Sequence, residues 1–164
     1  MKKILNLLLV LGLCFSLSGC QSSLQDEYSD LVKSADKCVS EISKSEGMQQ
    51  EQVKLEYKDI EKDDNNYITV IYSTEDGLQL KIKTTKNNEF DSITLTGDTD
   101  TAKNNYDFPA IVLGIIELSF FEFSDNSKNQ IIDLIDDGDG RLPLGEYTAT
   151  LRDYNNTLTF EISN

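Results

Sequence analysis

The sequence predicts an α+β fold in which helices cover an antiparallel sheet of about six strands. Three observations support this prediction. An apolar stripe with helical spacing covers residues 24–46, four short segments between residues 51 and 96 alternate with a period of two, and residues 147–162 form a further alternating pair. Residues 24–164 are long enough for one domain with a buried core, in the order α-β4-α-α-β2.

Residues 1–19 have the pattern of a secretion signal. Lys2 and Lys3 give a cationic start, an apolar core extends from Ile4 to Leu17, and small residues come next. The core is too short to cross a bilayer as a helix, which needs about 20 apolar residues. We therefore expect residues 1–19 to be removed from the mature protein.

The end of this signal, Leu17-Ser18-Gly19-Cys20, resembles the lipobox of bacterial lipoproteins. The resemblance implies that signal peptidase II cuts between Gly19 and Cys20, and that Cys20 carries a diacylglyceryl group and palmitate. The lipoprotein would then be anchored to the cell membrane on its extracytoplasmic face. An ordinary cleaved signal and an uncleaved short anchor are the alternatives.

The composition is rich in Asn, Lys, Ile and Asp, and is similar to that of lipoproteins from low-GC Gram-positive bacteria. In a Gram-negative host, Gln21 after the cysteine would favour the outer membrane.

Residues 20–23 are the lipidated cysteine and a short tether, which reaches roughly 10 Å when extended. Two acyl chains together hold a protein stably at a membrane. Because the tether is short, we expect the domain to lie close to the lipid headgroups.

Residues 24–46 are predicted to form one amphipathic helix. Ser23 and Asp26 resemble a capping box, and Gly47 can end the helix. The polar face is charged, and we assign it no function. Cys38 is the only cysteine of the mature chain besides Cys20, and we expect a buried thiol rather than a reactive one. The apolar face consists of Leu24, Tyr28, Leu31, Ala35, Cys38 and Ile42.

Four strands are predicted between residues 51 and 96. Apolar and polar residues alternate in 51–57, 67–74 and 78–83, and turn residues separate these segments. A fourth strand covers 90–96, with Ile93 and Leu95 expected on opposite faces. The tight turns favour an antiparallel meander.

Three segments complete the prediction. Residues 97–105 are expected to form an exposed loop, and residues 130–136 a short helix with Ile131, Ile132 and Ile135 inward. Residues 147–151 and 158–162 alternate around a turn at 153–156, which predicts a C-terminal hairpin.

The most apolar part of the mature chain, residues 108–123, is predicted to be a helix with Asp107 as its N-cap. A helix that is apolar on all sides is usually central to a core. The alternative is a helix that dips into lipid or binds a partner, with Gly114 and phenylalanines as contacts. The candidate binding residues are then Phe108, Phe120, Phe121 and Phe123.

The stretch Asp136-Asp137-Gly138-Asp139-Gly140 is the one candidate metal site in the sequence. Aligned on its last glycine, it resembles an EF-hand loop in which Asp137, Asp139 and Glu146 would bind calcium. Ile135 stands where that motif requires an Asp. A helix C-cap at Gly138 followed by a turn explains the same residues, so we expect no metal cofactor.

The mature chain is strongly acidic. Without residues 1–19 it has thirteen basic and twenty-nine acidic side chains, which gives a formal charge of −16. This charge argues against nucleic acid as a partner and against a polybasic contact with anionic lipid. It is compatible with a solvated surface, with cations, or with a cationic peptide as partner.

We expect no enzyme. The chain has no histidine, which rules out Ser-His and Cys-His nucleophilic pairs and His-ligated zinc. The favoured function is a binding module for an envelope protein or cationic peptide, similar to small immunity or exclusion lipoproteins. The alternative is a small-ligand-binding accessory of a transport or wall-assembly system, with its ligand between the sheet and the 108–123 helix. A weaker alternative is an enzyme inhibitor.

Overall fold

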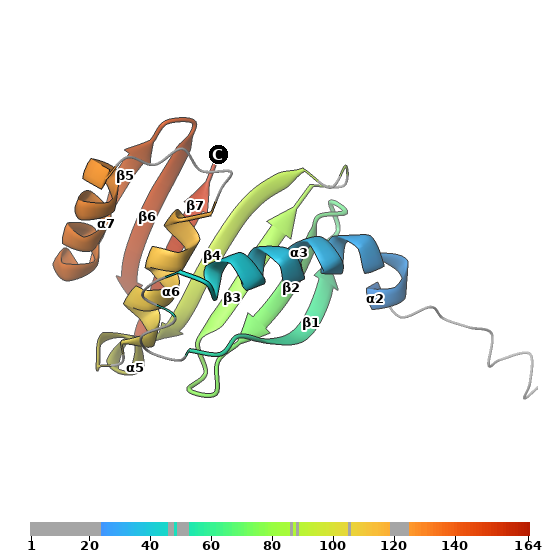
Figure 1. Cartoon of the computed structure of the whole chain (residues 1–164), viewed down its shortest axis with the longest axis horizontal. Coiled ribbons are helices and arrows are strands. Elements are labelled where there is room, and N and C mark those ends of the chain that lie inside the picture. The colour runs from blue at the N-terminus through green and yellow to red at the C-terminus, as the bar shows by residue number, and fades with distance from the viewer. Residues whose placement is uncertain are drawn as a thin grey trace, which may run out of the picture.

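In a computed structural model, the chain forms a seven-stranded antiparallel sheet (Figure 1). The structure describes residues 24–45, 48, 53–85, 87, 89–104, 106–118 and 125–164. The strand order is β1-β2-β3-β4-β7-β6-β5. The first meander, β1 to β4, and the second, β5 to β7, therefore meet where β4 pairs with β7. The strands are β1 (Glu56–Lys62), β2 (Ile68–Ser73), β3 (Gln79–Thr84), β4 (Phe90–Asp98), β5 (Gly140–Leu144), β6 (Tyr147–Tyr154) and β7 (Thr157–Ser163).

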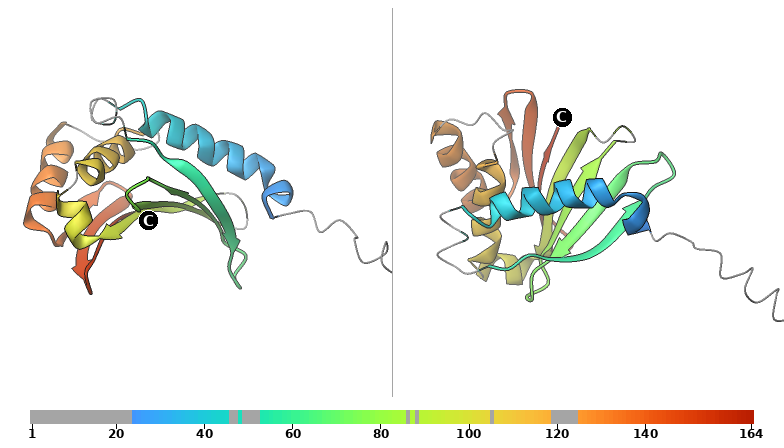
Figure 2. Two further views of the ribbon diagram at one scale, coloured as in Figure 1. Left: turned by 90° about the horizontal axis from the view of Figure 1, so that it is seen from below. Right: turned by 45° about the vertical axis from the view of Figure 1, so that its right-hand side comes forward.

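The described helices lie on one face of the curved sheet (Figure 2). The α3 helix crosses over the first meander, α6 packs against α3 and β4, and α7 packs against β5 at the other edge. The open face of the sheet carries no described helix. The helices are α2 (Leu24–Glu27), α3 (Ser29–Ile42), α5 (Thr99–Asn104), α6 (Asp107–Ile116) and α7 (Asp125–Asp137).

The alternation of apolar residues explains why one face of the sheet is buried. Side chains two apart on a strand share a face, and the strand register aligns these residues into rows across the sheet. The central buried row consists of Ile60, Val70, Ile82, Ile93, Ile162 and Ala149. The neighbouring row faces away from the helices and includes Lys81, Thr94 and Glu161. The buried apolar cluster runs from Leu31 to Ile162, so residues 24–164 contain a core of their own.

The predicted α+β class and the antiparallel sheet covered by helices are confirmed, but the sheet has seven strands rather than about six. The strand that the sequence did not predict is β5. Pro143 lies in this strand, opposite Thr148 of β6. Because β5 is an edge strand, the missing N–H of Pro143 can face away from the sheet and remove no ladder bond.

The bounds of the first elements differ from the prediction. The helix expected over 24–46 is interrupted at Tyr28, and α3 ends at Ile42. The first strand begins at Glu56 rather than at 51. The expectation that Ile93 and Leu95 lie on opposite faces is wrong, because residues two apart in a strand share a face and both are fully buried. The proposed caps, Ser23 and Gly47, lie outside the described residues.

The expected loop over 97–105 is wrong. Gly97 and Asp98 continue β4, and α5 follows directly. The Asp98 carboxylate accepts hydrogen bonds from the backbone N–H groups of Asp100 and Thr101, at 3.1 and 3.2 Å. Asp98 therefore caps the first turn of α5, which is how a polar stretch becomes a helix.

Among the described residues, the apolar helix predicted over 108–123 is shorter than expected. It ends at Ile116, and Asp107 is its first residue rather than its N-cap, since Tyr106 holds that position without a side-chain cap. Ile111 and Ile115 are fully buried, as a core helix requires. The helix predicted over 130–136 is confirmed within the longer α7, with Ile131 inward, but Ile132 is 42% exposed and Leu134 is buried instead.

The C-terminal hairpin is confirmed. Strands β6 and β7 pair from Thr148 with Ser163 to Tyr154 with Thr157. Asn155 and Asn156 connect them with φ angles of 50° and 62°, which suits asparagine in a two-residue turn.

Candidate functional site

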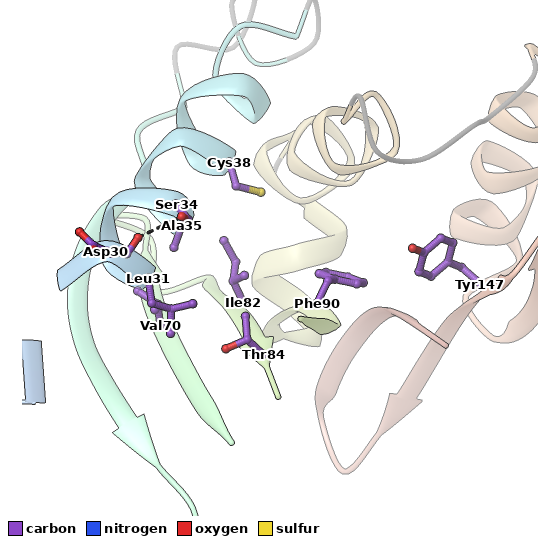
Figure 3. A pocket seen from close by; sticks show the side chains of 10 residues that line it. All are labelled: Asp30, Leu31, Ser34, Ala35, Cys38, Val70, Ile82, Thr84, Phe90 and Tyr147. Atoms are coloured by element: carbon purple, nitrogen blue, oxygen red, sulfur yellow. Dashed lines mark hydrogen bonds between the residues drawn. The ribbon is translucent and has the colours of Figure 1, made fainter. Parts of the chain in front are cut away.

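A cavity of about 370 Å³ lies between α3 and the helix-covered face of the sheet (Figure 3). Its walls come from one face of α3 and from four strands that the fold brings together. The lining residues are Asp30, Leu31, Ser34, Ala35 and Cys38 of α3, Val70 of β2, Ile82 and Thr84 of β3, Phe90 of β4 and Tyr147 of β6. Most of this surface is apolar, and its one charged side chain among the described residues, Asp30, is exposed.

A β-bulge places Phe90 in the cavity. In β4 the register shifts so that Ser92 pairs with Lys83 and Phe90 pairs with Thr84, which leaves Asp91 as the extra residue. Simple alternation would place Phe90 on the open face with Ser92 and Thr94. The bulge turns it to the helix side, as bulges commonly redirect a side chain.

Phe90 forms one wall together with Tyr147 of β6. The two rings meet edge to face, with centroids 5.9 Å apart and planes at 73°. Because β4 and β6 are separated by β7 in the sheet, this pair spans the junction of the two meanders. Aromatic pairs of this geometry are favourable beyond the area that they bury.

The opposite wall is α3, and a hydrogen bond from the sheet holds it in place. The Tyr72 hydroxyl of β2 donates to the Asp36 carboxylate of α3 at 2.6 Å. Burial, and next this hydrogen bond, raise the pKa of the Tyr72 phenol well above its ordinary value. Tyr57 of β1 packs edge to face on the Tyr72 ring, with centroids 6.1 Å apart. The charged face of α3, to which the sequence analysis assigned no function, thus supplies the contact that positions the helix.

Cys38 points from α3 toward the cavity (Figure 3). It is half-buried and, among the described residues, is the free cysteine. Burial, and then the nearby Glu41 carboxylate, raise the pKa of the thiol to about 12. At neutral pH it is therefore a neutral, weakly polar part of the wall.

The polar groups of the cavity are few. Ser34 donates its hydroxyl hydrogen to the backbone carbonyl of Asp30 at 2.9 Å, and the Asp30 carboxylate is exposed at the rim, 2.9 Å from Lys33. Thr84 and Tyr147 add hydroxyl groups from the sheet. Such a surface can bind an apolar body and orient it by one or two hydrogen bonds. Of the described lining residues, Ser34 and Thr84 donate their hydroxyl hydrogens to backbone carbonyls, so neither hydroxyl is paired with a side chain that could act as a base.

A second hollow, of about 560 Å³, lies beside β1 and is less suited to a ligand. It is lined by polar side chains that already pair with one another, as Lys54 does with Glu56 at 2.7 Å. Both charges are more than half exposed. We therefore take the cavity beneath α3 as the candidate site.

The structure separates the residues of the candidate calcium loop. Asp137 ends α7, and Gly138 follows with a φ of +78° and donates its N–H to the Leu134 carbonyl at 3.2 Å. This confirms the helix C-cap. The five residues of β5 then place Glu146 at the far end of a strand about 13 Å long, away from Asp139. Among the described residues no group of three or more potential metal ligands gathers.

The other predicted site residues divide into two groups. Phe108 is fully buried in the core and does not line the cavity, which lies beneath α3 rather than beneath α6 as the sequence suggested. The remaining candidates, Gly19, Cys20, Phe120, Phe121 and Phe123, lie outside the described residues. Within the described part of the chain, no helix has the length and apolar character needed to cross a bilayer.

The sequence analysis missed Ser34, Thr84, Phe90 and Tyr147 as site residues. Phe90 required the bulge, for which simple alternation gives no signal. Tyr147 required the strand order, since only the pairing of β4 with β7 brings it near β3. In comparisons with protein families, with curated proteins and with solved structures, nothing matches this chain.

Proposed function

We propose that this protein is a membrane-anchored extracytoplasmic lipoprotein whose domain binds a small apolar ligand in the cavity beneath α3. The lipobox at Leu17–Cys20 supports the anchor, and the apolar cavity supports the ligand. The small-ligand module is the alternative in the sequence analysis rather than the favoured function, and it is the one that requires such a cavity.

The size and the lining of the cavity carry this proposal. Ligand sites commonly measure about 300–1,000 Å³, with an apolar lining and a few placed polar groups. An apolar cavity of about 150 Å³ binds benzene. The space of about 370 Å³ beneath α3 is therefore large enough for a body of roughly two aromatic rings or an alkyl chain.

A direct test uses residues 21–164, which contain the whole described core, and the neutral dye N-phenyl-1-naphthylamine. A cooperative unfolding transition in urea first shows that the domain is folded. We then expect the dye to bind the domain saturably, with a rise in the fluorescence of the dye. Ala35→Met and Thr84→Met fill the cavity from opposite walls and should weaken binding at least about fivefold. Ser40→Met adds the same side chain on the exposed face of α3 and should leave binding unchanged. Absence of saturable binding by the folded domain contradicts the proposal.

The anchor is tested separately in the producing cell with the full chain. We expect the wild-type protein to incorporate labelled palmitate and to sediment with membranes. Cys20→Ala should abolish the label. A wild-type protein without lipid label would contradict the lipoprotein assignment and leave the cavity test unaffected.

An envelope protein or cationic peptide remains the second candidate, because the mature charge of −16 favours cationic partners. Capture from envelope extracts at low and high salt tests it. A basic partner that elutes with salt would support this candidate, and the cavity-filling variants then show whether the partner uses the same site.

A further inference from the structure

We infer that the ligand of the cavity is a cationic amphiphile, with its apolar body beneath α3 and its positive headgroup at the rim beside Asp30. This inference rests on the proposed function, because it names the chemical class of the ligand for the same site. Two observations support it: the charges of the residues that line the cavity, and the charges of the turns at the end of the sheet next to the cavity.

The described part of the wall offers no positive charge to an anionic headgroup. The described lining residues include no lysine and no arginine, and the one charged group among them is the Asp30 carboxylate. Asp30 lies in the first turn of α3, where a carboxylate meets the positive end of the helix dipole. An anion entering here would meet a carboxylate instead of a free helix N-terminus.

The turns at the same end of the sheet are acidic. Thr84, Phe90 and Tyr147 lie next to the β3–β4 and β5–β6 turns, and the β1–β2 turn is at this end as well (Figure 1). In the sequence, Lys86 and Glu89 stand between β3 and β4, and Glu146 stands between β5 and β6. The β1–β2 turn adds Asp63 and Asp64. In the sequence, these three connections therefore hold four acidic residues and one lysine.

Three described lysines lie near this end of the sheet, and each already has a partner. Lys83 lies on the open face, 3.7 Å from Asp91 and 4.0 Å from Asp63, and its ammonium group is 4.3 Å from the Tyr67 ring centroid. Lys62 donates to the Tyr28 hydroxyl at 2.8 Å. Lys33 pairs with Asp30, but both side chains are more than two thirds exposed, and such pairs contribute little in water. The field at the rim therefore favours a positive headgroup.

The test compares headgroups on one alkyl chain. Decyltrimethylammonium, decanoate and decyl glucoside, each below its micellar concentration, compete with N-phenyl-1-naphthylamine for residues 21–164. We expect the cation to displace the dye at about one tenth of the decanoate concentration at low salt, with the neutral glucoside between them. The difference should shrink at 0.5 M salt, where charges are screened.

Charge variants locate the effect. Asp30→Asn and Glu89→Gln should each lower the preference for the cation over decanoate by about twofold, because each removes one negative charge from the rim. Glu75→Gln removes an equal charge at the opposite end of the sheet, in the β2–β3 turn, and should leave the ratio unchanged. These variants are exposed and should not disturb the fold.

The outcomes are distinct from those of the cavity test. If the dye binds but decanoate competes as well as the cation, the charge inference is wrong and the apolar site stands. If the dye does not bind the folded domain at all, the proposed function fails, and this inference fails with it.

Discussion

A Cβ atom on Gly114 of α6 would lie 2.8 Å from Cγ2 of Ile42 and 2.9 Å from the Ile42 carbonyl oxygen at the end of α3. Both distances are shorter than carbon atoms tolerate, and a backbone oxygen cannot move without its helix. The close approach of the two helices therefore depends on the absence of a side chain at 114. Since α3 is one wall of the cavity, Gly114 also helps to fix the position of that wall.

We expect Gly114→Ala to destabilise the domain by about 1–3 kcal/mol, as overpacking in a tight core does. The higher helix propensity of alanine, about 1 kcal/mol, opposes this loss but does not exceed it. Urea unfolding measures the change. Ser40→Ala on the exposed face of α3 should stay within about 0.5 kcal/mol of the wild type. A more stable Gly114→Ala would show that α6 and α3 can separate freely.

The local sequence pattern predicted those helices and strands whose structure is determined by residues that are neighbours in the chain. Alternation predicted the β2 and β3 strands and the C-terminal hairpin, and helical spacing predicted α3. Alternation failed where the pairing between strands determines the structure. The segment with Pro143 forms a strand because it pairs at the edge of the sheet, and Phe90 faces the helices because of the bulge at Asp91. The cavity could not be predicted, because it depends on how far α3 stands from the sheet.

The hydrogen bond between Tyr72 and Asp36 should stabilise the packing of α3 on the sheet. We expect Tyr72→Phe to lower the free energy of unfolding by about 1 kcal/mol, which is less than is usual for a bond to a charged group because Asp36 is exposed. Asp36→Ala in the Tyr72→Phe background should then add little, since the bond is already lost. Tyr154→Phe, at an exposed position, is the matched control. Fully additive losses would show that the two residues act independently.

The same bond predicts a pH dependence at high pH. The pKa of Tyr72 is raised in the folded state by burial and then by Asp36, while the unfolded phenol titrates near its ordinary value of about 10. The stabilisation is therefore complete below pH 10 and is lost as the pH rises above it. Denaturant unfolding between pH 9 and 11.5 should show a steeper loss for the wild type than for Tyr72→Phe. Parallel curves for the two proteins would exclude this contribution.

The α5 helix is joined to the C-terminal hairpin by Asp153, which accepts hydrogen bonds from Lys103 and from the Thr99 hydroxyl, the latter at 2.8 Å. The hydrogen bond from Lys103, and next that from Thr99, lower the pKa of Asp153. This contribution is present above the unfolded pKa of about 3.9 and is lost as the pH falls through the lower folded value.

We therefore expect Asp153→Asn to destabilise the domain at pH 7 and to make its stability less dependent on pH between 5 and 2. Lys103→Met removes the main partner and should flatten the same part of the curve. Urea unfolding across this pH range checks both variants. If either variant kept the full wild-type slope, Asp153 would not be the group that titrates.

The Cys38 thiol should react slowly, because a pKa of about 12 leaves about a thousandfold less thiolate than an ordinary cysteine has at the same pH. In residues 21–164 Cys38 is the single thiol, so its alkylation by iodoacetamide at pH 8 follows one site. The matched control is Cys38→Ser with Ser40→Cys, which moves the thiol to the exposed face of the same helix and should react much faster. Occupation of the cavity by N-phenyl-1-naphthylamine should slow Cys38 further and leave the control unchanged, because only the first thiol faces the ligand. Equal rates for the two thiols would show that α3 does not hold Cys38 against the sheet as described.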